Sequence, residues 1–339
     1  MMSAAAPETA HPVRLFDRSA RFRMQFSGPK ASESLTGLVT NDVLALRGGD
    51  GLYACALTTK GRVIADVRIL ATAGADGPVE SLLVDTNAAA GVGFGSMIRK
   101  YMNPRLAKYS DATDATSCIT LVGVGTAALL RRISGDGSLI DEVASGAAFT
   151  HRRIRIGDTG LTLVRAPDLG VPDAFDLHMD RAGSGALIAR LTAAGAESSS
   201  EHDWHRLRVY AGRPEWGLDM DESTLAQEAN MDALQAISYR KGCYTGQETV
   251  ARVHFRGHVN RTLRRVRYGD AVPPDIGTPI LSADASPVGD TRSSAVSDAG
   301  ELIGIAMLRR EIGDGAVLTW TSADAAVHPL TVVGAPDAG

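Results

Sequence analysis

Residues Lys241–Glu248 read KGCYTGQE, and the run continues as TVAR to Arg252. The glycines on either side of Cys243 can adopt positive φ, which lets the backbone approach a bound ligand closely. A lysine beside a cysteine stabilises the thiolate and makes it more nucleophilic. We therefore interpret the run as a functional loop with Cys243 and Lys241 as catalytic candidates. We expect alanine at either position to leave folding nearly intact, as for other surface substitutions.

Aromatic and polar side chains of the same segment suit a flat heteroaromatic ligand. Tyr239 and Tyr244 offer apolar ring faces with a polar edge. Gln247 and Glu248 could read the hydrogen-bond donors and acceptors along the edge of such a ring. Taken by themselves, these residues leave a plain surface turn equally open.

The run Lys241–Glu248 resembles the K-G-C-Y-x-G-Q-E signature of the YgfZ family, a group of folate-binding proteins related to the glycine-cleavage aminomethyltransferase. Other segments are similar to that family in the same order along the chain: V-T-N-D at Val39–Asp42, K-G-R-x-x-A-D at Lys60–Asp66, and R-x-x-x-G-x-P at Arg208–Pro214. The resemblance extends over most of the chain, from about Phe16 to Gly257.

This resemblance implies an α+β fold of the aminomethyltransferase (GcvT) type, with mixed sheets and helices around a central channel and a small C-terminal β-barrel. We accordingly expect a disordered tail over residues 1–12, a folate-binding region of two interleaved α+β subdomains over 13–256, and a barrel domain over 257–335. The short strands and frequent turns after Arg256 agree with a barrel.

The resemblance also implies a function. It points to a tetrahydrofolate-binding accessory protein that supports assembly or repair of iron–sulfur enzymes, including those that modify tRNA. Tetrahydrofolate or a one-carbon derivative is the implied cofactor, and iron–sulfur client enzymes are the implied partners. Carried over residue by residue, Asp66 joins the catalytic candidates, and the folate-binding set comprises Asn41, Asp66, Tyr210, Tyr239, Tyr244, Gln247, Glu248 and Arg252.

A folate-dependent aminomethyltransferase, or another one-carbon transferase, is the alternative. The sequence departs from that enzyme at two places. Tyr210 stands where the enzyme has a glutamate that holds the pterin, and Ala65-Asp66 keeps one carboxylate of the enzyme's paired-aspartate hairpin. These departures favour the YgfZ branch, and the sequence leaves open whether a reaction is catalysed.

Composition argues against several classes of protein. The chain has 339 residues and a net charge of −4, which gives no support for nucleic-acid binding through bulk positive charge. Its three cysteines form no CxxC and are odd in number, which favours a reducing compartment over a disulfide framework. The N-terminus lacks the features of a secretory signal, and no apolar stretch reaches bilayer length. We therefore expect a cytoplasmic protein that does not associate with a membrane.

We also expect no metal site. His254 and His258 have a metal-like i,i+4 spacing but lack the glutamate of an HExxH motif. A zinc site built on cysteine is not expected either. Cys55 and Cys118 lie in apolar, strand-like runs and should be buried, unlike Cys243.

The sequence predicts three helices that matter for the fold. They lie at Ala31–Val43, with Ser32 as its N-cap, at Ala88–Met102 and at Ser200–Ala211. The glycine-bounded segment Gly135–Gly146 is expected to be a loop.

Overall fold

The computed structural model describes residues 12–72, 79–166, 169, 171, 173–297 and 299–334. Apart from Pro12, the tail expected over residues 1–12 lies outside the described residues. Contacts between Cα atoms divide the chain into two units. Unit 1 comprises Met1–Ser19 and Asp114–Ser200, and unit 2 comprises Ala20–Thr113 and Glu201–Gly339. The chain therefore passes twice through each unit.

Unit 1 is built on a six-stranded sheet with strand order β11-β1-β7-β10-β9-β8. β1 pairs with β11 in parallel, and the other neighbouring strands pair antiparallel. The strands are β1 (Arg14–Asp17), β7 (Thr116–Val122), β8 (His151–Ile156), β9 (Thr159–Arg165), β10 (Ala174–Asp180) and β11 (Glu197–Ser198). The helical elements are α3 (Thr126–Ile133), α4 (Gly137–Ser145), η2 (Arg181–Gly183) and α5 (Ser184–Ala193).

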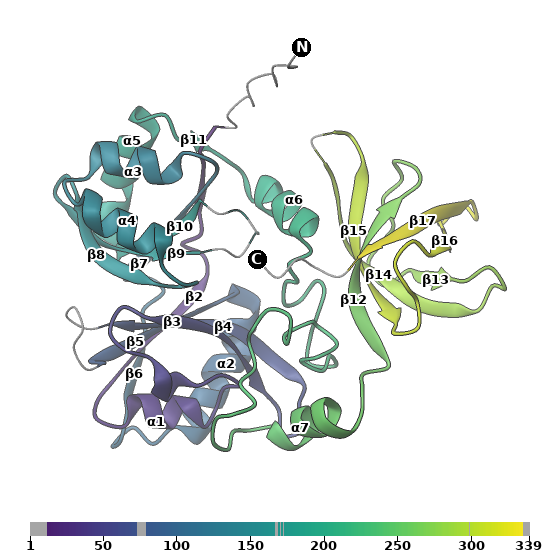
Figure 1. Ribbon diagram of the computed structural model, residues 1–339, viewed down its shortest axis with the longest axis horizontal. Coiled ribbons are helices and arrows are strands. Elements are labelled where there is room, and N and C mark those ends of the chain that lie inside the picture. The colour runs from purple at the N-terminus through teal and green to yellow at the C-terminus, as the bar shows by residue number, and fades with distance from the viewer. Residues whose placement is uncertain are drawn as a thin grey trace, which may run out of the picture. The chain divides into compact units, whose positions relative to one another are not determined.

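One face of this sheet packs against the α-helices and forms the core of unit 1 (Figure 1). The core includes the buried side chains of Leu121, Leu130, Ile140, Leu163, Leu177 and Leu191. Side chains alternate between the two faces of a strand, so the intervening residues of β7 and β10 point to the opposite face.

The expectation of a loop at Gly135–Gly146 is wrong, because Gly137–Ser145 forms helix α4. Ile140 and Val143, at i and i+3, are fully buried in the core of unit 1. Burial of this apolar stripe outweighs the low helix propensity of the glycine and serine residues in the segment.

Unit 2 begins with a five-stranded antiparallel sheet of order β3-β4-β5-β2-β6. Its strands are β2 (Phe22–Ser27), β3 (Gly51–Leu57), β4 (Val63–Thr72), β5 (Ser81–Thr86) and β6 (Lys108–Asp111). Helices α1 (Ala31–Thr36) and α2 (Ala88–Tyr101) share one buried core with this sheet, and a short 3-10 helix, η1 (Val43–Ala45), follows α1.

Helix α2 confirms the prediction at Ala88–Met102 although it contains three glycines. Gly91 is required there, because a Cβ at this position would lie 2.5 Å from Cγ of Phe22. The helix predicted at Ala31–Val43 is shorter than expected, since α1 ends at Thr36. Lys30 takes its N-cap position, so the assignment of that role to Ser32 is wrong.

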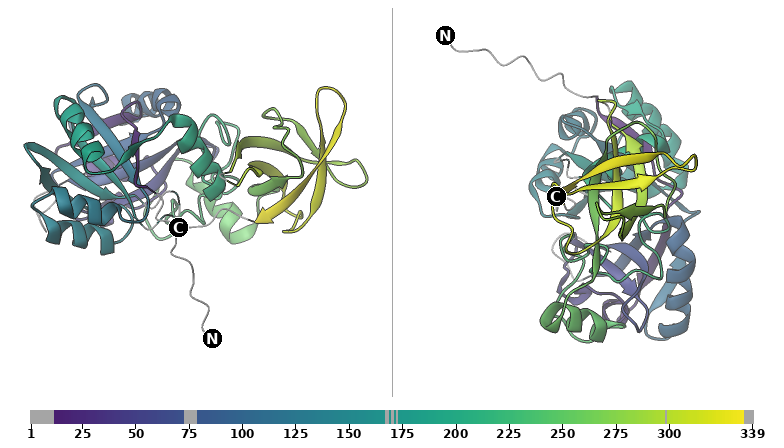
Figure 2. Two further views of the ribbon diagram at one scale, coloured as in Figure 1. Left: turned by 90° about the horizontal axis from the view of Figure 1, so that it is seen from above. Right: turned by 90° about the vertical axis from the view of Figure 1, so that its right-hand side faces the viewer.

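The C-terminal strands of unit 2 close into a six-stranded barrel of order β12-β15-β14-β13-β16-β17 (Figure 2). Trp320 and Tyr268 are buried in the barrel core, where their rings meet edge to face with 6.4 Å between centroids. The strands are β12 (Arg261–Tyr268), β13 (Pro279–Leu281), β14 (Pro287–Val296), β15 (Leu302–Arg309), β16 (Val317–Thr321) and β17 (Val327–Gly334). The expected small barrel is thus present.

Two helices complete unit 2. Helix α6 (Glu201–Ala211) matches the predicted helix to within a residue and packs on β14 and β15 of the barrel. Helix α7 (Gln247–Arg256) is a correction, because the sequence up to Arg252 reads as a polar loop. Val250 is the buried residue of α7, so the helix carries little of the apolar periodicity that would reveal it.

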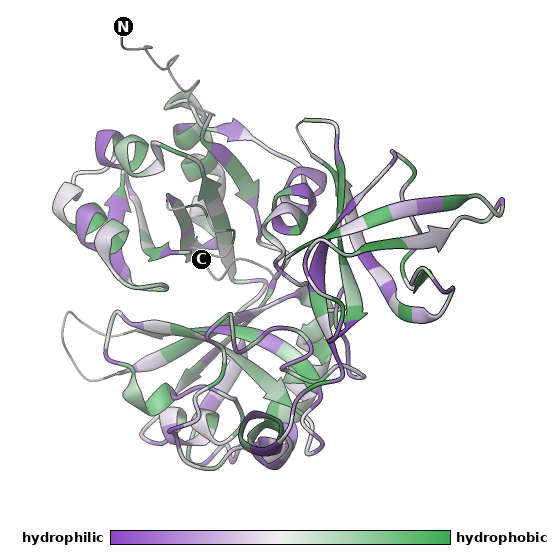
Figure 3. Ribbon diagram, turned by 45° about the vertical axis from the view of Figure 1, so that its right-hand side comes forward, coloured by the Kyte–Doolittle hydropathy of each residue, from purple (hydrophilic) through white to green (hydrophobic). Residues whose placement is uncertain are grey.

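Apolar residues concentrate along the strands of the two sheets and of the barrel (Figure 3). Among the described residues, no helix has both the length and the apolar character needed to cross a membrane.

Candidate functional site

The segment Lys241–Glu248 spans the end of a loop and the first turn of α7. Its Gly246 has a φ of +85°, and a Cβ there would lie 2.5 Å from the carbonyl oxygen of Thr58. Gly61, in the turn between β3 and β4, has a φ of +75°, and its Cβ would lie 2.8 Å from Cβ of Thr249. The two glycine turns thus pack together without room for side chains. This contact joins the KGR and KGCYTGQE segments into one structure.

Gly246→Ala should lower the free energy of unfolding of unit 2 by about 2–4 kcal/mol, because left-handed backbone strain adds to a clash with a backbone oxygen. Gly242→Ala is the matched control, since a Cβ at Gly242 meets no heavy atom within 4 Å. The control should stay within about 0.5 kcal/mol of wild type. Urea unfolding of both variants measures the difference, and equal stabilities would contradict the described packing.

Asn41 connects the V-T-N-D segment to two other parts of unit 2. Its Nδ2 donates to the carbonyl oxygens of Tyr53, on β3, and of Gln235, both at 2.9 Å. The adjacent Thr40 reinforces the connection, since its Oγ1 donates to the carbonyl oxygen of Ala236 at 2.6 Å. Both amide protons of Asn41 therefore hold the loop that precedes the KGCYTGQE run against β3.

Lys241 lies inside this arrangement and is buried. Its Nζ donates to the carbonyl oxygens of Thr36, Val39 and Asn41 at 2.5, 2.7 and 2.9 Å. An ammonium group has three protons, so these acceptors engage all of them. Burial lowers the pKa of Lys241 to about 8. Nζ also lies 4.9 Å from the centre of the Tyr244 ring.

This geometry changes the role of Lys241. The expectation that Lys241 is dispensable for folding is contradicted by its burial and its three hydrogen bonds. Cys243, by contrast, is exposed, whereas Cys55 and Cys118 are buried, as the sequence context predicts. Lys241 organises the loops beneath the motif, and Cys243 presents its thiol at the surface.

Asp66, on β4, has one carboxylate oxygen that is hydrogen-bonded and one that is not. Tyr53 donates its hydroxyl to Oδ2 at 2.8 Å, whereas Oδ1 is buried without a hydrogen-bond partner among the described residues. Burial raises the pKa of Asp66, and the Tyr53 hydrogen bond and the charges of Arg21 and Arg213 act in the opposite direction. A buried oxygen of this kind is an acceptor site for an N–H donor of a ligand.

Tyr239, which precedes the motif, and Tyr244, within it, differ in their surroundings. Tyr244 is buried, and Tyr239 is half-buried and stacks on His254 with 3.6 Å between ring centroids. The hydroxyl of Tyr239 donates to the carboxylate of Asp232. Burial raises the pKa of both tyrosines. His254 is thus part of an aromatic stack, and His258 lies beyond the end of α7, so the two histidines do not share a helix.

The remaining predicted site residues lie on α6 and α7. Gln247 is half-buried, and Glu248 and Arg252 are exposed at i and i+4, which places them on one face of α7. Tyr210 stands apart from this group. It is 62% exposed on α6 and lines a pocket with barrel residues that include Arg265. Within the described residues, no hydrogen bond joins the Tyr210 side chain to Asp66 or to Tyr53.

Sequence reasoning missed two residues beside Asp66. Tyr53 donates to the carboxylate of Asp66, and the guanidinium of Arg213 lies 5.3 Å from the centre of the Tyr53 ring. Arg213 belongs to the R-x-x-x-G-x-P segment, so the resemblance could have indicated it as a site residue. Tyr53 had no comparable signal, since it lies within an ordinary strand.

Arg208, the first residue of the R-x-x-x-G-x-P segment, anchors the barrel. It is buried, and its Nη1 donates to Oδ2 of the fully buried Asp219 at 2.6 Å. Its Nη2 donates to Oγ of Ser293, on β14, at 2.7 Å, and its Nε lies 2.7 Å from Oε2 of Glu215. One guanidinium thereby ties α6, the following loop and the barrel together.

Comparison with known proteins identifies relatives over most of this chain. An iron-sulfur cluster assembly factor IBA57 homolog, mitochondrial, from Neurospora crassa is 28% identical over 81% of this chain. The tRNA-modifying protein YgfZ from Escherichia coli O127:H6 is 34% identical over 31% of this chain. This chain spans 58% of the length of the Neurospora relative and 32% of the length of the Escherichia relative. The predicted resemblance to the YgfZ group is thereby confirmed.

A solved structure confirms the fold. The glycine cleavage system aminomethyltransferase T from Bartonella henselae superposes with a TM-score of 0.82, covering 97% of this chain and 87% of that chain at 17% sequence identity. The mixed sheets and the C-terminal barrel of this chain therefore form the GcvT-like fold that the sequence predicts. The family model for the GCVT N-terminal domain matches residues 2–238, and the protein belongs to the GCVT N-terminal domain family.

Proposed function

We propose that this protein binds a reduced folate in unit 2 and supports assembly or repair of iron–sulfur enzymes, including those that modify tRNA. The observation that carries the proposal is the buried Oδ1 of Asp66, which has no hydrogen-bond partner among the described residues. In this proposal the folate-binding residues lie within residues 13–256, and residues 257–335 form the barrel domain.

The polar end of the folate meets Asp66 in this proposal. Tetrahydrofolate presents N–H donors on its pterin ring, and Oδ1 of Asp66 accepts from one of them. Tyr53 holds the other carboxylate oxygen at 2.8 Å, which fixes the orientation of the acceptor. Asn41 acts indirectly, because its amide positions the backbone of Tyr53 and the loop at Gln235. When bound, the folate supplies a carrier for one-carbon units.

The other predicted residues complete the binding set. The half-buried Tyr239 supplies aromatic surface for the ligand, and the buried Tyr244 supports the loop from beneath. Gln247 and Glu248 supply polar groups at the start of α7. The exposed guanidinium of Arg252 suits the carboxylates of the folate tail. Tyr210 has the weakest support, since it faces the barrel strands.

The exposed thiol of Cys243 is the reactive group in this proposal. It lies in the loop that leads into α7. Lys241 contributes by holding the loops around it rather than by contacting the client. Two relatives, one named as an iron–sulfur cluster assembly factor and the other as a tRNA-modifying protein, support a role with iron–sulfur client enzymes. We place this role in the cytoplasm, where the three free thiols stay reduced.

Complementation tests this role. In a strain that lacks its own protein of this type, the wild-type chain should restore the activity of an iron–sulfur enzyme that thiolates tRNA. Cys243→Ala should abolish rescue, because the thiol is lost at an exposed position where folding is little affected. Cys55→Ala is the control for loss of a cysteine outside the motif. The amount of soluble Cys55→Ala protein should be measured in parallel.

Full rescue by Cys243→Ala would remove the reactive thiol from the proposal.

A one-carbon transferase, the alternative activity, predicts a different pattern. Asp66→Asn would then end rescue even at saturating folate, whereas a folate-binding accessory protein regains function as the folate concentration rises.

A further inference from the structure

Unit 1 holds a cluster of side chains that the folate proposal does not use. Cys118, on β7, and His178, on β10, are direct cross-strand partners in the antiparallel pair. Asp176 lies two residues before His178 and is paired with Thr120. Because side chains alternate along a strand, all four residues point to the face of the sheet that is opposite the helices. Leu121 and Leu177, one position along, belong to the helix-packed core.

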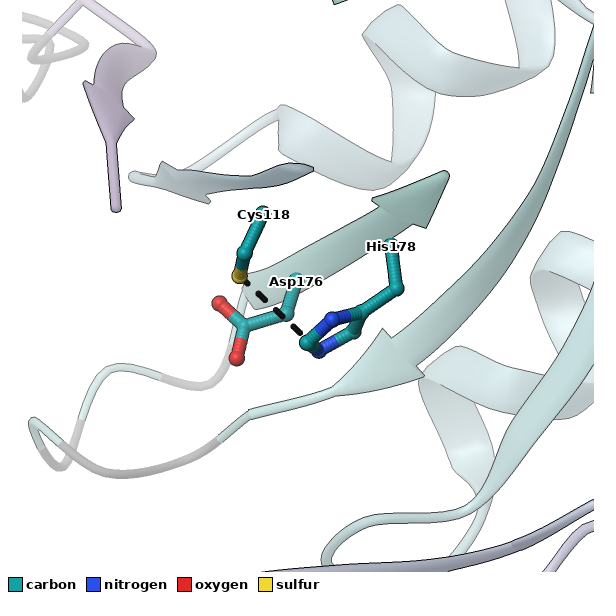
Figure 4. Close-up of side chains that lie close together, drawn as sticks. All are labelled: Cys118, Asp176 and His178. Atoms are coloured by element: carbon teal, nitrogen blue, oxygen red, sulfur yellow. Dashed lines mark hydrogen bonds between the residues drawn. The ribbon is translucent and has the colours of Figure 1, made fainter. Parts of the chain in front are cut away.

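The three potential ligand atoms converge (Figure 4). Sγ of Cys118 lies 3.8 Å from Nε2 of His178, and one atom each from Cys118, Asp176 and His178 lie within 4.8 Å of one another. All three residues are buried, with exposed fractions of 0%, 1% and 7% for Cys118, Asp176 and His178. A thiol, an imidazole and a carboxylate thus meet away from solvent.

We propose that Cys118, Asp176 and His178 bind a divalent transition metal ion, with Zn²⁺ as the best match. Thiolate, imidazole and carboxylate together are the donor set of zinc sites. Zn–S and Zn–N bonds of about 2.3 and 2.0 Å at a tetrahedral angle put sulfur and nitrogen about 3.5 Å apart. The observed 3.8 Å is close to that spacing. Three protein ligands leave one tetrahedral position to a non-protein ligand.

The surroundings of the cluster also suit a metal site. Thr120 donates its hydroxyl to Oδ1 of Asp176 at 2.5 Å. In metal sites, hydrogen bonds of this kind orient the carboxylate that binds the metal. The two residues that follow β1 hold the backbone of Cys118. The N–H of Cys118 donates to Oγ of Ser19 at 3.2 Å, and its carbonyl oxygen accepts from the N–H of Arg18 at 2.8 Å. These two bonds fix the backbone that carries the Cys118 side chain.

A cysteine hydrolase is the competing interpretation of a Cys, His and Asp trio. It is disfavoured because a nucleophilic thiol must reach a substrate, and Cys118 has no exposed surface. The expectation of no metal site from sequence rested on local motifs. Here the ligands come from strands far apart in sequence, and only the β7–β10 pairing unites them.

Cobalt titration of the full chain tests the site. After treatment with a chelator, one equivalent of Co²⁺ should produce the thiolate-to-metal charge-transfer band of a cysteine-bound cobalt ion, and Zn²⁺ should displace it. Cys118→Ala should lose this band. Cys55→Ala, which removes the other buried cysteine, and Cys243→Ala, which removes the exposed one, should keep it.

Two further measurements keep the test decisive if Cys118→Ala folds poorly. Thr120→Val should weaken Co²⁺ binding by about 10- to 100-fold, as for other outer-shell changes. Zn²⁺ should raise the melting temperature of the wild-type protein but not of Asp176→Asn. Absence of the band in the wild-type protein would overturn the proposal. So would a band that persists in Cys118→Ala and disappears in Cys243→Ala.

Discussion

Arg208→Ala should lower the free energy of unfolding of unit 2 by about 3–5 kcal/mol, because it leaves the buried carboxylate of Asp219 without its charge partner. Asp219 is fully buried and lies 2.6 Å from the guanidinium. The substitution also removes the donor to Ser293 of the barrel. We expect loosening of the barrel from α6 together with the loss of stability.

All three tryptophans lie in unit 2, so their fluorescence during urea unfolding reports on this unit. Arg267→Ala is the matched control, because its pair with Glu301 is exposed on both sides, and it should cost no more than about 1 kcal/mol. Arg208→Met combined with Asp219→Leu should be less destabilising than the sum of the single changes. Equal effects of Arg208→Ala and Arg267→Ala would contradict the anchoring role.

Lys241→Met should lower the free energy of unfolding of unit 2 by about 2–3 kcal/mol. The three carbonyl oxygens that its ammonium engages would lose their donor inside the protein. Methionine keeps most of the side-chain volume, so the effect isolates the lost hydrogen bonds. The loss of stability is limited because methionine also removes the cost of burying the Lys241 ammonium group.

The neighbouring Arg240 supplies the control for Lys241. Arg240 is exposed, so Arg240→Met removes a positive charge near Cys243 with a stability change within about 0.5 kcal/mol. Tryptophan fluorescence in urea measures both variants. A Lys241→Met protein as stable as Arg240→Met would show that the carbonyl contacts do not support the loop.

These contacts show which parts of the fold follow from local sequence. Helix α2 and helix α6 are predicted nearly to their ends, and Gly212 marks the end of α6 in the sequence. Helix α7 has one buried residue and therefore little apolar periodicity, and the glycines that frame α4 obscure the apolar stripe formed by Ile140 and Val143. Tertiary packing decides both cases.

The candidate site divides in the same way. The motif residues could be identified from sequence, and Cys243 is exposed as expected. The roles of Lys241 and Asn41 could not, because they depend on carbonyl oxygens of segments distant in the chain. No local pattern reveals which way such a side chain points.

Calorimetric titration with tetrahydrofolate measures whether the protein binds a reduced folate and whether Asp66 takes part. The wild-type protein should bind one equivalent with saturable heat, and Asp66→Asn should bind at least about tenfold more weakly, the equivalent of one lost hydrogen bond to a charged acceptor. Cys243→Ala should bind like the wild-type protein, since its thiol serves the client and not the folate. Absence of heat from the wild-type protein up to millimolar tetrahydrofolate would contradict folate binding, and equal binding by Asp66→Asn would contradict the role of Asp66.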